Sequence, residues 1–210
     1  MEIRVQSKCK KITTFVFDID GVFTDGTIQV GENDILRTFS VRDGYAVQIA
    51  AKSGFRMAVI SGGRQESIRK RLAGLGIQDI FLGVGTNEKP QIFDQFIAKY
   101  QLTEEEVLYI GDDIPDLLVM QEKAVFSCCP ADAVEEVRRQ ADYISPINGG
   151  KGAVRDVIEL VMKSQKKWLK VFYTFLLVLK TRTTAAPWWP NQTLRHCLER
   201  CKAIRPQLYL

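Results

Sequence analysis

Four groups of polar residues in the sequence have types and an order that could support phosphoryl chemistry. They are DIDG at 18–21, SGG at 61–63, Lys89 in TNEKP, and GDDIPD at 111–116. Carboxylates gathered at about 4 Å repel one another by roughly 1 to 4 kcal/mol per pair, and a hard dication removes that cost. Because carboxylates with few other ligands and room for water suit Mg²⁺, we expect a magnesium site.

The other polar groups are suited to hold a phosphoryl group beside that metal. The hydroxyl of Ser61, backbone N–H groups freed by the neighbouring glycines and the ammonium of Lys89 could bind its oxygens. A carboxylate can be the nucleophile and form an aspartyl-phosphate. Taken singly, these groups are more typical of a turn, a helix cap or a solvated lysine. A calcium loop is excluded because positions six and twelve, counted from Asp18, hold Phe23 and Gln29.

Alternating apolar runs and helical patterns indicate which elements position these groups. Strands are predicted at Ile12–Phe17, Met57–Ser61, Ile80–Val84, Val107–Ile110 and Ala124–Ser127. Helices are predicted near Asp43–Ser53, Arg64–Gly74, Pro90–Tyr100, Pro115–Gln121 and Ala131–Gln140, with a closing helix in NGGKGAVRDVIELVMKSQ. This alternation predicts an α/β fold, a Rossmann-like three-layer sandwich with a parallel sheet. Ligands bind beyond the carboxyl ends of such strands, where Asp18, Ser61 and Asp112 fall.

One segment departs from the alternation. TIQV and ILRTFSV, separated by GEND, predict a β-hairpin at about residues 26–41. It is too small to be a second domain. We expect it to serve as a flap over the site in place of a cap domain, or as an edge that pairs with another subunit.

The composition is that of a soluble globular protein, with 46% apolar and 26% charged residues among 210. The N-terminal MEIRVQSKCKKITT lacks the apolar stretch of a signal peptide, so we expect a cytoplasmic protein. The net charge of +4 is unevenly spread. From Lys163 onward there are ten basic residues and one acidic residue, whereas the preceding 162 residues have 19 basic and 24 acidic.

We therefore divide the chain into a domain over residues 1–164 and a basic, aromatic extension over 165–210. The run from Trp168 to Leu179 is shorter than the ~20 residues that cross a bilayer. A membrane-interface contact, a subunit contact and an accidental or disordered extension stay open, with membrane contact the less expected. Nucleic-acid binding is not expected, because no recognised module frames the basic residues. CLERC at 197–201 only weakly suggests zinc, and reduced cysteines are the better interpretation.

The four motifs, from about Thr14 to about Ala153, resemble those of the haloacid dehalogenase-like phosphatase superfamily. Within it, the chain is similar to the 3-deoxy-D-manno-octulosonate 8-phosphate phosphatases. The stretches that carry this similarity are DIDGVFTDG, SVRDGYAVQIAAKSG, KRLAGLGI, GDDIPDLLVM and NGGKGAVRD. The resemblance implies a cap reduced to the hairpin, Mg²⁺ dependence, a homotetramer in which a neighbour helps close the site, and a role in lipopolysaccharide precursor synthesis.

The resemblance also implies residue roles. Asp18 would be the nucleophile and a metal ligand. Asp20 would protonate the leaving sugar oxygen and later activate water, while its backbone carbonyl holds the metal. Ser61 and Lys89 would bind the phosphoryl oxygens, and Asp112 would complete the metal shell.

Further roles are expected around these residues. Asp113 and Asp116 are expected to orient Lys89 and bound waters. An arginine can grip the carboxylate of a sugar acid bidentately. The residues expected to bind substrate are Arg42, Asp43, Gly44, Arg64, Arg71 and Lys89. For Asp43 and Arg71, a structural interpretation is as well supported as substrate binding. Asp43 could cap a helix, and Arg71 could lie on a solvated face. The family often has Arg where this chain has Gly63, so whether Arg64 makes that contact stays open.

Two alternatives stay open at the level of function. The substrate could be a nine-carbon, sialic-type sugar acid 9-phosphate, because both substrates share the α-keto acid end. A non-catalytic assembly domain of the same fold is disfavoured, because every residue needed for chemistry is present. Those residues are Asp18, Asp20, Ser61, Lys89 and Asp112.

Overall fold

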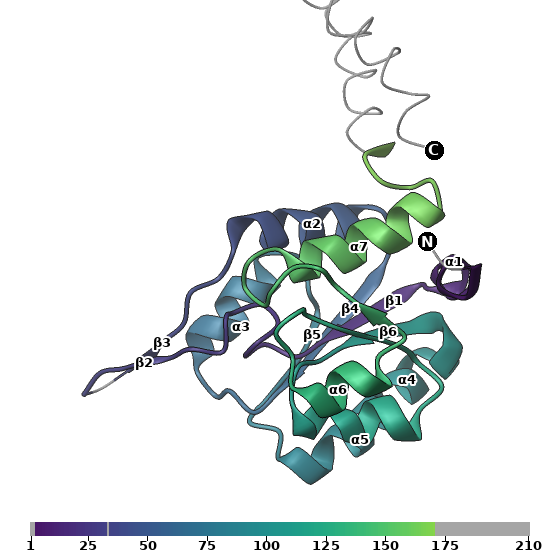
Figure 1. The fold of residues 1–210 in the computed structure, drawn as a ribbon. Coiled ribbons are helices and arrows are strands. Elements are labelled where there is room, and N and C mark those ends of the chain that lie inside the picture. Colours follow the sequence, from purple (N-terminus) through teal and green to yellow (C-terminus); the bar gives the residue numbers. More distant parts are fainter. Residues whose placement is uncertain (1–2, 33, 171–210) are drawn as a thin grey trace, which may run out of the picture.

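A parallel sheet lies at the centre of the computed structural model, which describes residues 3–32 and 34–170 (Figure 1). Within these residues the sheet has six strands in the order β5-β4-β1-β6-β7-β8. The strands are β1 (Thr14–Phe17), β4 (Arg56–Ser61), β5 (Asp79–Leu82), β6 (Val107–Ile110), β7 (Phe126–Cys129) and β8 (Tyr143–Ile144). The predicted α/β fold is confirmed. The two-residue β8 was not predicted, because so short a strand has no periodicity of its own.

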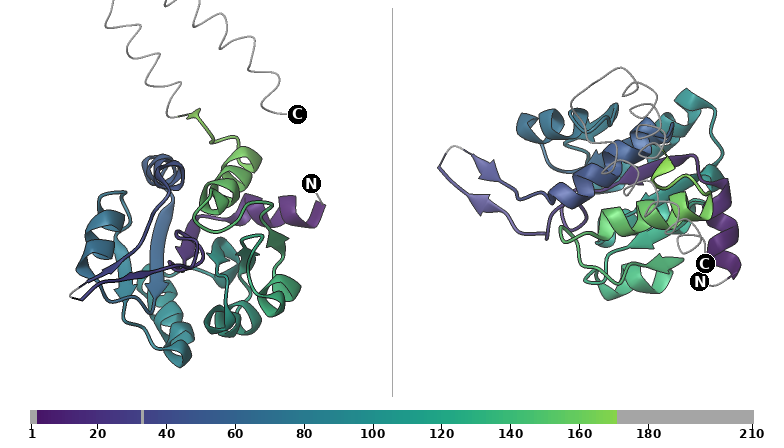
Figure 2. Two further views of the ribbon diagram at one scale, coloured as in Figure 1. Left: turned by 60° about the vertical axis from the view of Figure 1, so that its left-hand side comes forward. Right: turned by 90° about the horizontal axis from the view of Figure 1, so that it is seen from above.

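Helices cover both faces of the sheet (Figures 1 and 2). One layer contains α1 (Ile3–Lys11), α2 (Val41–Lys52), α3 (Glu66–Ala73) and α7 (Ala153–Ser164), and the other contains α4 (Lys89–Tyr100), α5 (Ile114–Glu122) and α6 (Glu135–Gln140). Alternate side chains of β1 divide between the layers. Phe15 and Phe17 belong to the core cluster on the α2 and α7 side, and Val16 belongs to the cluster on the α4 side. All three are fully buried. Because both faces of β1 are covered, its sequence is a continuous apolar run instead of an alternating one.

Helix α1 was not predicted, because its sequence IRVQSKCKK has few apolar residues. Val5 and Cys9 are four residues apart and both are buried, so one narrow stripe of this helix faces the core. Lys8 and Arg4 form ion pairs with Asp142, which precedes β8. The helix is therefore held by tertiary contacts that local sequence patterns do not report.

The predicted hairpin is confirmed, with β2 (Gln29–Val30) and β3 (Ile35–Leu36) paired antiparallel. It projects away from the body of the domain (Figures 1 and 2). Its strands are shorter than the apolar runs that predicted them. Val30 and Leu36 are exposed, so the hairpin tip has little packing within the described chain.

The residues just after α7 pack on the domain. The side-chain amide of Gln165 donates hydrogen bonds to the carbonyl oxygens of Cys9 (2.8 Å) and Ile12 (2.7 Å). Trp168 is 9% exposed and belongs to the core cluster. The rest of the extension, including CLERC, lies outside the described residues. Within the described part, no helix is both long and apolar enough to cross a membrane.

Candidate active site

Three of the four polar groups meet in one pocket at the carboxyl edge of the sheet, and the fourth contributes Pro115 to its lining. The strand β1 pairs with β4 and β6 on either side, so Asp18 lies next to the ends of both neighbours. The pocket has a volume of about 430 Å³. It is lined by Asp18, Asp20, Ile35, Arg37, Ser61, Gly62, Gly63, Arg64, Gln65, Val84, Thr86, Lys89 and Pro115. Two of these residues, Ile35 and Arg37, come from the hairpin, as expected of a flap.

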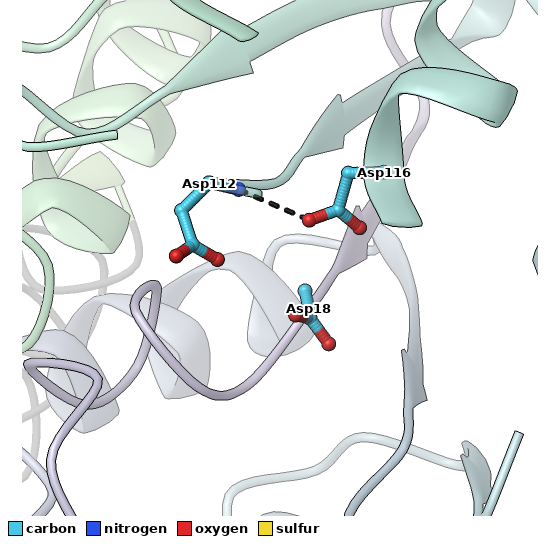
Figure 3. A group of neighbouring side chains, drawn as sticks. All are labelled: Asp18, Asp112 and Asp116. Carbon is cyan, nitrogen blue, oxygen red and sulfur yellow. Dashed lines mark hydrogen bonds between the residues drawn. The ribbon is translucent and has the colours of Figure 1, made fainter. Parts of the chain in front are cut away.

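A cluster of three carboxylates lies at the ends of β1 and β6 (Figure 3). Oxygens of Asp18, Asp112 and Asp116 lie within 4.8 Å of one another. Asp18 Oδ1 and Asp112 Oδ1 are buried and accept no hydrogen bond, although Lys89 Nζ forms an ion pair with Asp18 Oδ1 at 3.3 Å. Buried acceptors without partners are costly unless a ligand satisfies them. Hard oxygen donors of this kind fit a dication such as Mg²⁺.

Asp116 has a different role in the cluster, because both of its oxygens already accept hydrogen bonds. Oδ1 accepts from Lys89 Nζ (2.7 Å) and from the Tyr109 hydroxyl (2.7 Å). Oδ2 accepts from the backbone N–H groups of Asp112 (3.0 Å) and Asp113 (3.4 Å). This arrangement holds Lys89 in place. Tyr109 was missed because a fully buried residue inside a strand looks like core.

The buried charges shift the pKa values of the site. Burial, and then the neighbouring Asp116, raises the pKa of Asp18 to about 7, although Lys89 opposes the shift. Burial, and then Asp18 and Asp116, raises the pKa of Asp112 to about 8. Burial lowers the pKa of Lys89, but the charges of Asp18 and Asp116 outweigh it and raise this pKa above its ordinary value. A dication beside Asp18 and Asp112 would favour their ionised forms.

Gly21 makes the close approach of the two carboxylate loops possible. Its φ is +77°, and a Cβ there would lie 1.9 Å from Asp112 Oδ2. Any side chain at this position would therefore displace the Asp112 carboxylate. This explains why glycine directly follows the two aspartates of DIDG.

Ser61 and Lys89 lie where they can hold a phosphoryl group next to Asp18. Ser61 ends β4 and is 1% exposed, and its Oγ accepts a hydrogen bond from the Gly63 N–H (3.3 Å). Lys89 begins α4, and its Nζ lies 3.3 Å from Asp18 Oδ1. A serine hydroxyl, glycine N–H groups and an ammonium therefore converge on the pocket beside the predicted nucleophile.

The side chain of Asp20 is paired with Arg37, which was not among the predicted site residues. Arg37 Nε and Nη2 donate to the two carboxylate oxygens of Asp20 at 2.6 and 2.9 Å. Arg37 lies in the predicted hairpin, whose alternation gave no reason to separate it from an ordinary surface residue. The sequence offered one indication of this role: Arg37 directly follows Ile35 and Leu36 in the second strand of the proposed flap, close to where the flap would join the site.

The predicted substrate-binding residues divide into two groups. Lys89 and Arg64 line the pocket, whereas the other four are not among its described lining residues. Arg42 and Arg71 are exposed, and a Cβ on Gly44 would lie 2.8 Å from Arg71 Nη2.

Asp43 lies in the first turn of α2 and is fully buried, in contact with α7 and not among the described lining residues of the pocket. Its Oδ1 accepts a hydrogen bond from the Arg155 N–H (2.8 Å) in the first turn of α7. Asp113 caps its own helix, since its Oδ1 accepts from the Ile114 N–H at 2.7 Å. Both carboxylates therefore satisfy helix N-termini, a common structural role for acidic residues.

Comparisons with known proteins agree with this geometry. A family model described as haloacid dehalogenase-like hydrolase matches residues 29–122. The 3-deoxy-D-manno-octulosonate 8-phosphate phosphatases of Salmonella typhi and Escherichia coli K12 are each 38% identical over 164 residues, which cover 78% of this chain and 86% of theirs.

Solved structures of the same kind superpose on the chain. The phosphatase from Yersinia pestis has a TM-score of 0.77 at 33% identity, covering 81% of this chain and 91% of that one. The phosphatase from Moraxella catarrhalis, solved with a magnesium ion, a phosphate ion and a KDO molecule, has a TM-score of 0.78 at 32% identity, covering 83% and 99%. The chain belongs to the haloacid dehalogenase-like hydrolases and, within them, to the 3-deoxy-D-manno-octulosonate 8-phosphate phosphatase family.

Proposed function

We propose that this protein is a phosphoric monoester hydrolase that converts 3-deoxy-D-manno-octulosonate 8-phosphate into the free sugar acid and phosphate, with Mg²⁺ as cofactor. The observation that carries the proposal is the pair of buried oxygens on Asp18 and Asp112 that accept no hydrogen bond. Lys89 Nζ lies 3.3 Å from the Asp18 oxygen, and Ser61 lines the same pocket as Asp18. The family of the chain indicates the substrate.

The reaction has two steps in this proposal. An oxygen of Asp18 attacks phosphorus and the bond from phosphorus to the sugar oxygen breaks, while Asp20 gives its proton to that oxygen. Water then attacks the aspartyl-phosphate, its proton passes to Asp20, and Asp18 is released. Asp18, Asp112 and the backbone carbonyl of Asp20 would hold Mg²⁺, which when bound neutralises charge between the carboxylates and the phosphoryl group.

Ser61 and Lys89 bind the phosphoryl oxygens during both steps. Because Lys89 is held by Asp116, its ammonium is fixed before the substrate arrives and needs no rearrangement as negative charge moves. Asp113 caps α5, because its carboxylate accepts a hydrogen bond from the Ile114 N–H. The chemistry therefore uses groups from four segments that meet at one edge of the sheet.

The acidic end of the substrate requires cations at the pocket mouth. Arg64 is available within this chain. Arg42 and Arg71 would act only on a substrate held by a neighbouring copy, which is consistent with a homotetramer whose neighbour closes the site. The exposed apolar residues Val30 and Leu36 of the hairpin support such a contact. In this setting the enzyme acts in the cytoplasm, in lipopolysaccharide precursor synthesis, and any membrane contact comes from the extension.

The experiment is a phosphate-release assay of the purified full chain with Mg²⁺. The substrates are the 8-phosphate of 3-deoxy-D-manno-octulosonate and the 9-phosphate of a nine-carbon sialic-type acid. We expect kcat/KM to be highest for the eight-carbon substrate. Asp18→Asn should remove turnover while the protein still folds, as a cooperative thermal unfolding transition would show. A higher kcat/KM for the nine-carbon substrate would overturn the substrate, and no hydrolysis of any phosphate ester would favour an assembly domain.

A further inference from the structure

Arg37 bridges three parts of the pocket that are distant in sequence. Beyond its two hydrogen bonds to Asp20, its Nη1 donates to Gln65 Oε1 at 2.9 Å. Gln65 immediately precedes α3, and Arg37 immediately follows β3. The Arg37 side chain is only 9% exposed, although it comes from the base of an exposed hairpin. Paired hydrogen bonds of this kind fix the orientation of a carboxyl group.

The guanidinium lies next to Gly63. A Cβ on Gly63 would lie 3.6 Å from Arg37 Nη2 and 3.7 Å from Ser61 Oγ. Arg64 takes another direction, because its Cγ and Nε lie 3.3 and 3.5 Å from the position of a Cβ on Gly83. Arg37, and not Arg64, is therefore the arginine that contacts Asp20, and its two hydrogen-bond partners, Asp20 and Gln65, both line the pocket.

We propose that Arg37 is a positioning residue, which holds the Asp20 carboxylate at the pocket mouth and ties it to the base of the hairpin. The Asp20 side chain is 35% exposed and, in the described chain, its hydrogen bonds come from Arg37 alone. Without Arg37, this carboxylate would be free to turn into solvent. The kinetic part of this inference rests on the proposed function, in which Asp20 carries the proton in both steps.

The structural tie can be measured without turnover. Hydrogen exchange of the full chain, followed by mass spectrometry, reports on peptides that cover residues 28–39. Arg37→Ala and Asp20→Asn should both speed exchange in these peptides, because each removes the same bidentate pair. Arg139→Ala, which removes an exposed arginine paired with Glu135 on α6, is the matched control and should leave the hairpin unchanged. Unchanged exchange in Arg37→Ala would overturn the tie.

The role in catalysis is measured with a double-mutant cycle. Arg37→Ala should lower kcat at least about tenfold and change KM less than about threefold, because positioned acid–base groups contribute about 10² to 10⁴ in rate. In the Asp20→Asn background, the same change should alter kcat by less than about twofold, since Arg37 acts through Asp20. Arg37→Lys keeps the charge without the bidentate geometry, so its kcat should be intermediate.

Two kinetic results would overturn the inference. A raised KM with unchanged kcat would make Arg37 a substrate-binding residue, and an equal loss in the Asp20→Asn background would show that it acts independently of Asp20. The cycle is run with whichever phosphate ester the wild-type chain hydrolyses. If the wild-type chain hydrolyses another phosphate ester but not the eight-carbon substrate, the proposed substrate is contradicted. The double-mutant cycle can still be measured with the ester that is hydrolysed.

Discussion

Lys89 and Asp116, 27 residues apart in sequence, are joined by a buried 2.7 Å hydrogen bond between Nζ and Oδ1. The side chains are 4% and 1% exposed, so water does not compete for either group. The pair connects the start of α4 to the first turn of α5, and it directs the ammonium toward Asp18. In the proposed mechanism, the binding of the phosphoryl group by Lys89 depends on this contact.

Breaking this pair should impair catalysis. In Asp116→Asn the buried Lys89 loses a charged partner, so the ammonium is held less firmly beside Asp18. We expect kcat to fall about 10² or more, in line with the loss of one preorganised donor, while KM changes little. Steady-state phosphate release measures this. Asp94→Asn, which removes a half-exposed carboxylate paired with Lys123, is the control. Wild-type kcat in Asp116→Asn would mean that Lys89 needs no orienting partner.

Stability in the absence of Mg²⁺ should depend on pH. The folded-state pKa values of Asp18 and Asp112 are raised from 3.8 to about 7 and about 8. At a pH between the unfolded and the folded pKa values, the folded chain therefore binds more protons than the unfolded chain. The free energy of unfolding should therefore fall as pH rises from about 4 to about 8. Thermal unfolding with chelator at pH 5.5 and pH 8 measures this.

Adding Mg²⁺ should reverse the loss, with a larger rise in Tm at pH 8 than at pH 5.5, because the metal binds the ionised carboxylates. Asp112→Asn should raise the Mg²⁺-free Tm at pH 8 and remove most of the Mg²⁺ effect. An equal Mg²⁺ effect in this variant would place the metal elsewhere.

Replacing Asp43 distinguishes a structural role of this residue from a role in substrate binding. Its buried carboxylate caps the first turn of α7. Burial raises the pKa of Asp43, and its hydrogen bond from Arg155 opposes that shift. Asp43→Ala should lower the free energy of unfolding by about 1–2 kcal/mol, the usual cost of a lost helix cap, with KM nearly unchanged. Denaturant unfolding and steady-state kinetics on the same preparation decide the matter. A raised KM with unaltered stability would restore the substrate-binding role.

The first residues of the extension should matter for stability. Ending the chain after residue 164 removes Gln165 and Trp168, which bond and pack against the core, and should cost about 3–5 kcal/mol, as for loss of a buried large side chain. Ending it after residue 170 keeps these contacts and should preserve Tm within a few degrees. Similar Tm values for the two truncations would show that the contacts of Trp168 contribute little.

The fold could be predicted from local patterns in the sequence. Apolar β1 and β6 end in DIDG and GDDIPD, and a parallel sheet brings such ends together, so the pairing of Asp18 with Asp112 could be predicted without coordinates. Asp116 was likewise expected to orient Lys89, and the two are in contact.

The rest depended on contacts between distant segments. Arg37 lies in the site because the base of the hairpin lines the pocket, a placement that its own sequence does not specify. Tyr109 points toward Asp116 from the middle of a strand that reads as core. Asp43 looked like part of a substrate motif, but the packing of α2 on α7 encloses it. Local patterns predict elements, whereas these placements come from how the elements pack.

The most direct test is to identify the phosphorylated residue during turnover. A rapid acid quench of the wild-type protein during turnover with substrate and Mg²⁺ should trap the aspartyl-phosphate, and borohydride reduction followed by peptide mass spectrometry locates it. The account predicts modification at Asp18 and nowhere else, with none in Asp18→Asn. Phosphate release by the wild-type protein with modification at another residue, or with Asp18→Asn still active, would contradict it.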